Sequence, residues 1–83
     1  MDIRRQVGLN VRQIRKERGW SQEDLAFESG LDRTYISGVE RGIRNPTVLV
    51  LHEMAQALRV PAARLLDAPE PKARAAKARR TQL

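Results

Sequence analysis

The segment from Ser21 to Pro46 constrains the fold more than any other part of this chain. It reads SQEDLAFESGLDRTYISGVERGIRNP and holds two short helical patterns separated by a glycine-containing turn. Ser21 can cap the first helix, and Asp24 three residues later can complete a capping box. Gly30 can end that helix because a residue without Cβ adopts a positive φ at little cost, and Asp32 can cap the next one. Two short helices joined by a tight corner are therefore predicted here.

The rest of the chain predicts further helices. Apolar residues recur at helical spacing and alternating β-branched runs are absent, so we expect an all-α fold of five helices. Capping residues, glycines and prolines divide the pattern into helices over residues 2–18, 22–29, 33–41 and 48–58, with a final helical turn over 61–66. Residues 1–66 would form one domain. Residues 67–83 would form a basic tail, since the composition shifts there to Ala, Pro, Lys and Arg.

The composition limits the functions that this chain can have. It contains no cysteine and a single histidine, His52, which excludes disulfides, zinc–thiolate sites and a histidine metal cluster. No nucleophile–base pair or carboxylate pair stands out, so we expect no enzymatic activity, cofactor or small-molecule ligand. The longest apolar run, residues 48–51, is far shorter than the roughly 20 residues that span a bilayer. A cytoplasmic protein without a membrane partner is the default expectation.

The charge favours a polyanionic partner. The formal net charge is +6 and the sequence pI is near 11.1. Nucleic acid and an anionic membrane surface both meet this condition, so charge alone does not decide between them. Residues 67–83 carry five basic and two acidic side chains. This tail could contact DNA phosphates or simply remain solvated.

The predicted helices resemble the DNA-binding domain of phage repressor and Cro proteins, the XRE family of bacterial regulators. The resemblance covers roughly residues 3–66 and rests on the strings VGLNVRQIRKERGWSQEDLA, SGLDRTYISGVERG and NPTVLVLHEMAQALRV. The string LDRTYISGVERGIRN is similar above all to the controller proteins of restriction–modification systems. The resemblance implies that the second and third helices form a helix-turn-helix that binds double-stranded DNA.

In a helix-turn-helix, the first residues of the second helix face the base edges in the major groove. Base contacts are therefore expected from Arg33, Thr34, Tyr35 and Ser37. Arg33 is the first candidate, because a guanidinium can donate two hydrogen bonds to guanine O6 and N7. Tyr35 could equally be a half-buried residue that covers the edge of the core. Gly38 costs about 1 kcal/mol relative to alanine in a helix, and crowding against DNA or the preceding helix explains it most simply.

Phosphate contacts are expected around these residues. Gln22 resembles a family glutamine that binds a backbone phosphate, and it lies at a helix N-terminus, which favours anions. The connection after the third helix supplies three more candidates that would position the protein without reading sequence, namely Arg41, Arg44 and Asn45. Arg15 and Glu40 occupy positions that form a structural ion pair in the family.

A contact with one DNA half-site buries too little surface for tight specific binding, so we expect a homodimer on a palindromic operator. Family members commonly dimerise through their last two helices. The corresponding apolar candidates are Leu49, Val50, Val60, Leu65 and Leu66. Arg59 stands where the family often has glycine, and arginine would be strained at a positive φ, so we expect this corner to close differently.

These features predict a sequence-specific transcriptional regulator that binds duplex DNA as a dimer. The alternative is an antitoxin-like interaction module with autoregulatory DNA binding. Such a module would neutralise a partner protein through its tail or through the helix over residues 48–58.

Overall fold

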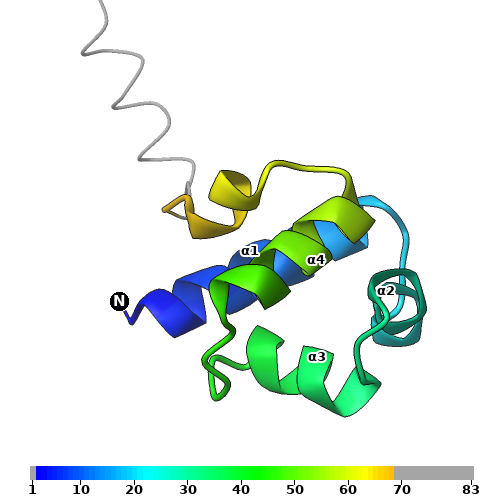
Figure 1. The fold of residues 1–83 in the computed structure, drawn as a ribbon, viewed down its shortest axis with the longest axis horizontal. Helices are drawn as coiled ribbons and strands as arrows, with labels where there is room; N and C mark the ends of the chain where they lie inside the picture. Colours follow the sequence, from blue (N-terminus) through cyan, green and yellow to red (C-terminus); the bar gives the residue numbers. More distant parts are fainter. Residues whose placement is uncertain (1, 69–83) are drawn as a thin grey trace, which may run out of the picture.

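The computed structural model describes residues 2–68, which form four α-helices and one 3-10 helix. The bounds are α1 (Ile3–Glu17), α2 (Gln22–Ser29), α3 (Arg33–Glu40), α4 (Val48–Leu58) and the 3-10 helix η1 (Ala62–Leu66). In Figure 1, α1 and α4 lie across the middle of the molecule, with α2 and α3 on one side and η1 on the other. The predicted tail lies outside the described residues from position 69 onward.

The all-α class is confirmed for residues 2–68, which contain no strand. The prediction of five α-helices needs correction, because the last helical turn is a 3-10 helix. Its backbone N–H groups reach only three residues back, with Arg64 N donating to Pro61 O at 2.9 Å. Short 3-10 helices are common in connecting segments and at the ends of α-helices.

Each α-helix begins at a residue whose side chain accepts a hydrogen bond from a backbone N–H group of the first turn. The four capping residues are Asp2, Ser21, Asp32 and Thr47. The predicted capping box is confirmed, since Ser21 Oγ accepts from Asp24 N at 3.0 Å and Ser21 N donates to Asp24 Oδ2 at 2.8 Å. These caps satisfy N–H groups that have no partner inside the helix.

All four α-helices are followed by a left-handed residue. Three of these are glycines (Gly19, Gly30 and Gly42), and the fourth is Arg59, with a φ of 60°. The expectation that this last corner closes differently is wrong. The left-handed turn lets Val60 N donate to Ala55 O at 3.0 Å and directs Val60 back onto the core. The corner therefore closes as a glycine corner would, and Arg59 carries a backbone strain of about 1–2 kcal/mol.

The core draws on all five helical segments. Its buried apolar residues are Val7, Val11, Ile14, Leu25, Ile36, Val39, Met54, Ala55, Leu58 and Leu65. The 3-10 helix is fixed to α1 by the buried Asn10, whose Nδ2 donates to Leu65 O at 2.9 Å and to Asp67 O at 2.6 Å. These hydrogen bonds hold η1 against α1, where Leu65 is fully buried in the core.

Gly8 allows α1 and α3 to pack with their backbones in contact. A Cβ atom added to Gly8 would lie 2.7 Å from Glu40 O and closer still to Val39 O. Both obstacles are backbone atoms, which cannot move without separating the helices. The sequence analysis did not identify this position, because its requirement comes from another helix.

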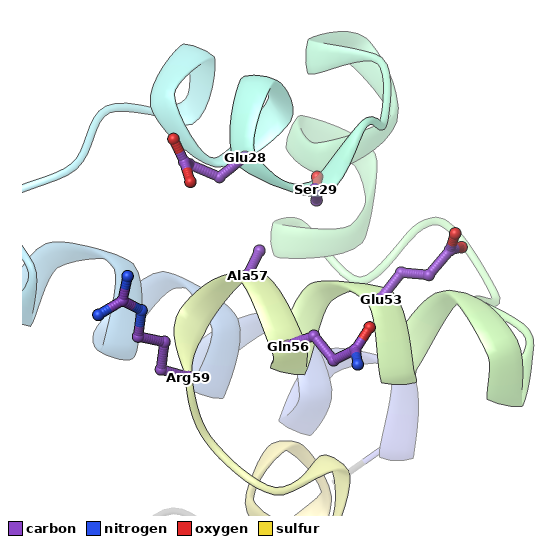
Figure 2. Close-up of a pocket in the computed structure, with 6 residues that line it drawn as sticks. All are labelled: Glu28, Ser29, Glu53, Gln56, Ala57 and Arg59. Carbon is purple, nitrogen blue, oxygen red and sulfur yellow. The ribbon is translucent and has the colours of Figure 1, made fainter.

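A solvent-open hollow of about 360 Å³ lies between the end of α2 and the second half of α4. Figure 2 shows its lining residues, which are Glu28, Ser29, Glu53, Gln56, Ala57 and Arg59. Two carboxylates face this hollow and one arginine lies at its end. Two carboxylates make it a poor site for a polyanion, so a DNA-binding surface is better sought on α3.

Candidate nucleic-acid interface

α3 has one side packed into the protein and another directed outward. Ile36 and Val39 are fully buried and Glu40 is 8% exposed, whereas Arg33 and Thr34 are exposed. Because an α-helix turns 100° per residue, Thr34 lies on the side away from this buried set, whereas Ser37 lies between the two sides and is half-buried. The structure therefore exposes two of the four predicted base-reading residues at the start of α3, and the other two, Tyr35 and Ser37, are half-buried.

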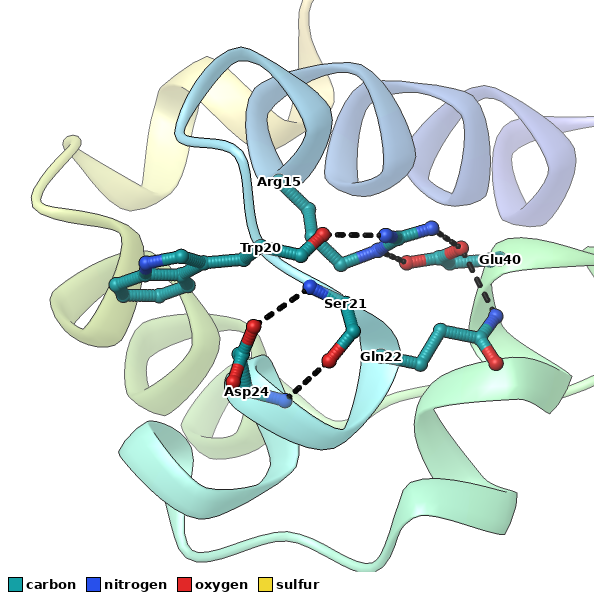
Figure 3. Close-up of polar contacts among 6 residues, drawn as sticks. All are labelled: Arg15, Trp20, Ser21, Gln22, Asp24 and Glu40. Carbon is teal, nitrogen blue, oxygen red and sulfur yellow. Dashed lines mark hydrogen bonds and ion pairs between the residues drawn. The ribbon is translucent and has the colours of Figure 1, made fainter.

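A buried polar network fixes the inner side of α3. Arg15 of α1 donates through Nε to Glu40 Oε2 at 2.7 Å and through Nη2 to Glu40 Oε1 at 2.9 Å. The remaining guanidinium nitrogen, Nη1, donates to Trp20 O at 2.7 Å (Figure 3). The hydrogen bonds to Glu40 raise the pKa of Arg15 above its ordinary value. This two-pronged pair joins α1 to the C-terminal end of α3, as the family resemblance implied.

Gln22 extends the same network to α2. Its Nε2 donates to Glu40 Oε1 at 3.1 Å, so that the first residue of α2 is tied to the last residue of α3 (Figure 3). In the free protein this amide braces the two helices against each other. A phosphate contact from Gln22 stays a prediction, and it would use the part of the amide that Glu40 does not occupy.

The outer side of the α2–α3 corner carries a second ion pair, which the sequence analysis did not predict. Arg33 Nε lies 3.5 Å from Glu23 Oε2, and the two side chains are 56% and 70% exposed. Exposed pairs of this kind contribute at most about 1 kcal/mol to stability. Arg33 is therefore lightly held and can exchange this partner for another.

Gly38 and Arg44 form a contact on the outward side of α3 that corrects one sequence-based explanation. A Cβ atom on Gly38 would lie 2.6 Å from Arg44 Cγ. The crowding at Gly38 thus comes from a side chain of the α3–α4 connection, and neither α2 nor DNA is needed to explain it. The Arg44 guanidinium in turn lies over the half-buried ring of Tyr35, 5.8 Å from its centroid.

The other predicted phosphate-contacting residues lie at the C-terminal end of α3 and beyond it. Arg41 is the C-cap residue of α3, and Asn45 precedes Pro46 in the connection to α4. Both are exposed, as is Arg44. All three predicted residues are thus exposed at the end of α3 or in the connection from α3 to α4, whose course Figure 1 shows.

The predicted dimer-interface residues differ in their accessibility. Leu49 is 66% exposed and Leu66 is 44% exposed, so both can contact a partner. Val50 and Val60 are half-buried against the core. Leu65 is a correction, because η1 turns it inward to a fully buried position where no partner can reach it. The exposed apolar residues that were not among the predicted interface candidates are Ile3, Leu9, Phe27, Ile43 and Val48.

None of the helices in the described part of the chain combines the length and apolar character that crossing a bilayer would need. Within the same residues, every buried side-chain nitrogen or oxygen has a hydrogen-bond partner. The polar residues that remain available for recognition are therefore those on the surface.

Known proteins are similar to this chain in sequence and in fold. A transcriptional regulator of the helix-turn-helix type from Sinorhizobium fredii, itself uncharacterised, is 50% identical over 60 residues, which cover 72% of this chain and 78% of the relative. The control protein C.BamHI of Bacillus amyloliquefaciens is 48% identical over 67 residues, 80% of this chain and 83% of that protein.

One solved structure with a similar fold contains DNA. The restriction–modification controller protein C.Esp1396I, solved as a tetramer in complex with its natural 35 base-pair operator, matches with a TM-score of 0.72 and 42% identity. The match covers 78% of this chain and 86% of the controller protein. The helix-turn-helix family (HTH_3) matches residues 11–65, the segment that contains α2, α3 and their corner. The chain therefore belongs to the helix-turn-helix family and is similar to restriction–modification controller proteins.

Proposed function

We propose that this protein is a sequence-specific transcriptional regulator that binds operator DNA as a homodimer. The observation that carries the proposal is the outward side of α3, whose first residues are exposed while its inner side is fixed by the Arg15–Glu40 pair. A helix held in this way can enter the major groove with its N-terminal side chains leading. The operator complex of C.Esp1396I, 42% identical to this chain, supports the same use of the fold.

The proposal assigns base reading to Arg33, Thr34, Tyr35 and Ser37 and phosphate contacts to Gln22, Arg41, Arg44 and Asn45. Arg33 would leave Glu23 and donate to guanine O6 and N7, a contact worth about 1–3 kcal/mol of discrimination. The phosphate contacts would set the orientation of the protein on DNA without reading sequence. The proposed function is DNA binding without a catalytic step, and its proposed location is the cytoplasm.

A homodimer would join two such domains through the apolar residues left exposed near α4 and η1. Leu49 and Leu66 supply this surface, and Ile3 lines the same shallow hollow as Leu66. A twofold dimer would present two α3 helices to half-sites about 34–36 Å apart. Val50 and Val60 would contribute only at the edge, because they already pack against the core.

Selection of bound duplexes from a random DNA pool tests the proposal. We expect a palindromic site, and we expect Arg33→Ala to relax the preference at one base pair in each half-site by on the order of tenfold or more. Lys16→Ala is the matched control, because it removes one exposed positive charge from α1. An absence of any preferred sequence at low salt would refute the proposal. A site that Arg33→Ala leaves unchanged would refute the role given to Arg33.

The dimer is tested separately by sedimentation of Leu49→Glu and Leu66→Glu. Each charge should shift the protein toward a monomer, because it would be buried without a partner in the interface. Phe27→Glu is the control, since Phe27 is a strongly exposed apolar residue on α2. Dimers that tolerate both leucine changes would place the interface elsewhere.

A further inference from the structure

One side of α1 carries a row of exposed side chains that lies outside the helix-turn-helix. Positions 5, 9, 12 and 16 follow one another at intervals of four, three and four residues, which places them along a single stripe of an α-helix. The members of this α1 stripe are Arg5, Leu9, Arg12 and Lys16, and all four are exposed. Over about 16 Å of helix axis, the stripe therefore carries three positive charges and no negative one.

The three charges of the α1 stripe have no internal partner. In the described part of the chain, none of Arg5, Arg12 and Lys16 forms an ion pair with a carboxylate. Their neighbour Arg4 does, at 2.8 Å from Asp2. The stripe can therefore take an anionic partner without first breaking a contact within the protein.

The distribution of charge over the domain indicates that the α1 stripe serves more than solubility. Residues 2–68 carry 11 basic and 9 acidic side chains, so that this part of the chain is nearly neutral. The two signs are nevertheless separated, because α2 has three acidic residues and no basic one, which is the reverse of the stripe. A mixed surface is enough for solubility, whereas a stripe of one sign favours the approach of a polyanion from one side.

The α1 stripe runs between the two places where phosphate contacts are predicted. At its first end, Arg5 packs against the α3–α4 connection, since a Cβ atom added to Gly42 would lie 3.0 Å from Arg5 Cα. Figure 1 shows the start of α1 near this connection. At the other end, Glu40 accepts hydrogen bonds from both Arg15 of α1 and Gln22 of α2. The stripe therefore continues the predicted phosphate-contacting surface along α1.

We propose that Arg5, Arg12 and Lys16 bind phosphates of the DNA that flanks the segment read by α3. α1 meets α3 at the C-terminal end of α3, where Gly8 lies against the carbonyl group of Glu40, whereas base reading is assigned to the N-terminal end. A contact from α1 therefore falls outside the bases that α3 reads. Basic side chains there neutralise phosphate charge without reading sequence. The inference rests on the proposed function and extends its DNA surface from the helix-turn-helix to α1.

The first test is a salt titration of a triple variant that combines Arg5→Gln, Arg12→Gln and Lys16→Gln. These changes remove the charges and keep a helix-forming side chain, so the variant should fold with the wild-type Tm. The DNA is the selected operator with one additional turn of duplex at each end. The slope of log affinity against log salt should become shallower by about 0.9 for each lost phosphate contact, or about 2.7 for each protomer. The preferred sequence should not change.

Arg12 allows a comparison with matched single variants. Arg12→Gln should make the slope shallower by about 0.9 for each protomer, whereas Arg12→Lys keeps the charge and should keep the slope. Arg59→Gln is the control, because it removes an exposed positive charge beside the acidic hollow between α2 and α4. Its slope should stay near that of the wild type. Equal changes in Arg12→Gln and Arg59→Gln would show a general effect of net charge and would overturn the proposed contact.

The length of the duplex tests where the contact falls. Removing the additional turn from each end should weaken binding of the wild-type protein and should leave the affinity of the triple variant unchanged. A wild-type protein that binds the long and the short duplex equally well would overturn the contact with flanking DNA.

Two further outcomes would overturn the proposal. An unchanged slope in the triple variant would show that the α1 stripe is a solvated surface. If the slope is unchanged but vesicles of anionic lipid bind the wild type and not the triple variant, the stripe would belong to a membrane contact. If the wild-type protein selects no sequence, the proposed function fails, and a shallower slope of the triple variant on a mixed-sequence duplex would still support the phosphate contact.

Discussion

The two sides of α3 differ in how firmly they hold their charges. On the inner side, Arg15 and Glu40 form two hydrogen bonds of 2.7 and 2.9 Å between nearly buried side chains. On the outer side, Arg33 and Glu23 form one contact of 3.5 Å between side chains that are more than half exposed. The inner pair fixes where α3 lies. The outer pair leaves Arg33 free to take another partner, which is what a reading residue needs.

The largest effect is expected from breaking the inner pair. Glu40→Ala would leave the Arg15 charge buried without its partner, and we expect the free energy of unfolding to fall by about 3–5 kcal/mol. This is a large part of the 5–15 kcal/mol that stabilises a typical domain. Urea denaturation measures the change. Glu23→Ala, the matched change on the outer side, should lower stability by at most about 1 kcal/mol, and equal losses would end the distinction.

A smaller loss is expected where α1 meets the inner side of α3. Gly8→Ala would push a methyl group into the backbone carbonyls of Val39 and Glu40, and we expect it to cost about 1–3 kcal/mol or more. Thermal denaturation measures this change. Gly38→Ala is the matched comparison on the outer side, where the obstacle is the flexible side chain of Arg44. The contrast fails if Gly8→Ala is the better tolerated of the two.

A gain of about 1 kcal/mol is expected away from α3, at the corner after α4. Arg59→Gly would remove the strain of a left-handed arginine, less the entropy that glycine gains in the unfolded chain. The corresponding rise in Tm is about 4–8 °C. Gln56→Gly, on an exposed position of α4, is the control and should lower Tm. A Tm unchanged by Arg59→Gly would show that the corner is not strained.

The smallest effect is expected from an exposed pair at the start of α1. Hydrogen bonds from the Arg4 side chain and backbone lower the pKa of Asp2 from 3.8 to about 2. Because the folded-state pKa is depressed, this stabilisation is present above pH 4 and is lost as the pH falls through 2. Asp2→Asn keeps the cap but cannot titrate. Its Tm difference from the wild type at pH 6 should therefore disappear near pH 2, and a constant difference would contradict the assignment.

The helix bounds could be predicted because their determinants are local. The predicted bounds of α2 and α4 match the structure, whereas α1 is shorter than predicted by one residue at each end and α3 by one residue at its C-terminal end. A cap acts over two or three residues, and a left-handed residue ends a helix through its immediate neighbours. The prediction at Arg59 was wrong because packing of Val60 on the core, which is a tertiary effect, outweighs the local backbone strain.

Features of the site that join distant segments could not be predicted from the same signals. The Glu23–Arg33 contact depends on the angle of the α2–α3 corner, and the fully buried Leu65 depends on η1 folding back on α1. The sequence analysis predicts that DNA or the preceding helix crowds Gly38, whereas the structure shows that Arg44 does so. Family resemblance supplied the Arg15–Glu40 pair, whose members are 25 residues apart.

The sequence by itself determined where helices begin and end and which of their sides are apolar, because caps, glycines and periodic spacing act within a turn or two of the chain. Only the tertiary structure decided which charges are buried together, which apolar residues remain on the surface and which arginine covers Gly38. Those outcomes depend on how the helices cross one another. The crossing is set by contacts between side chains that are far apart in the sequence.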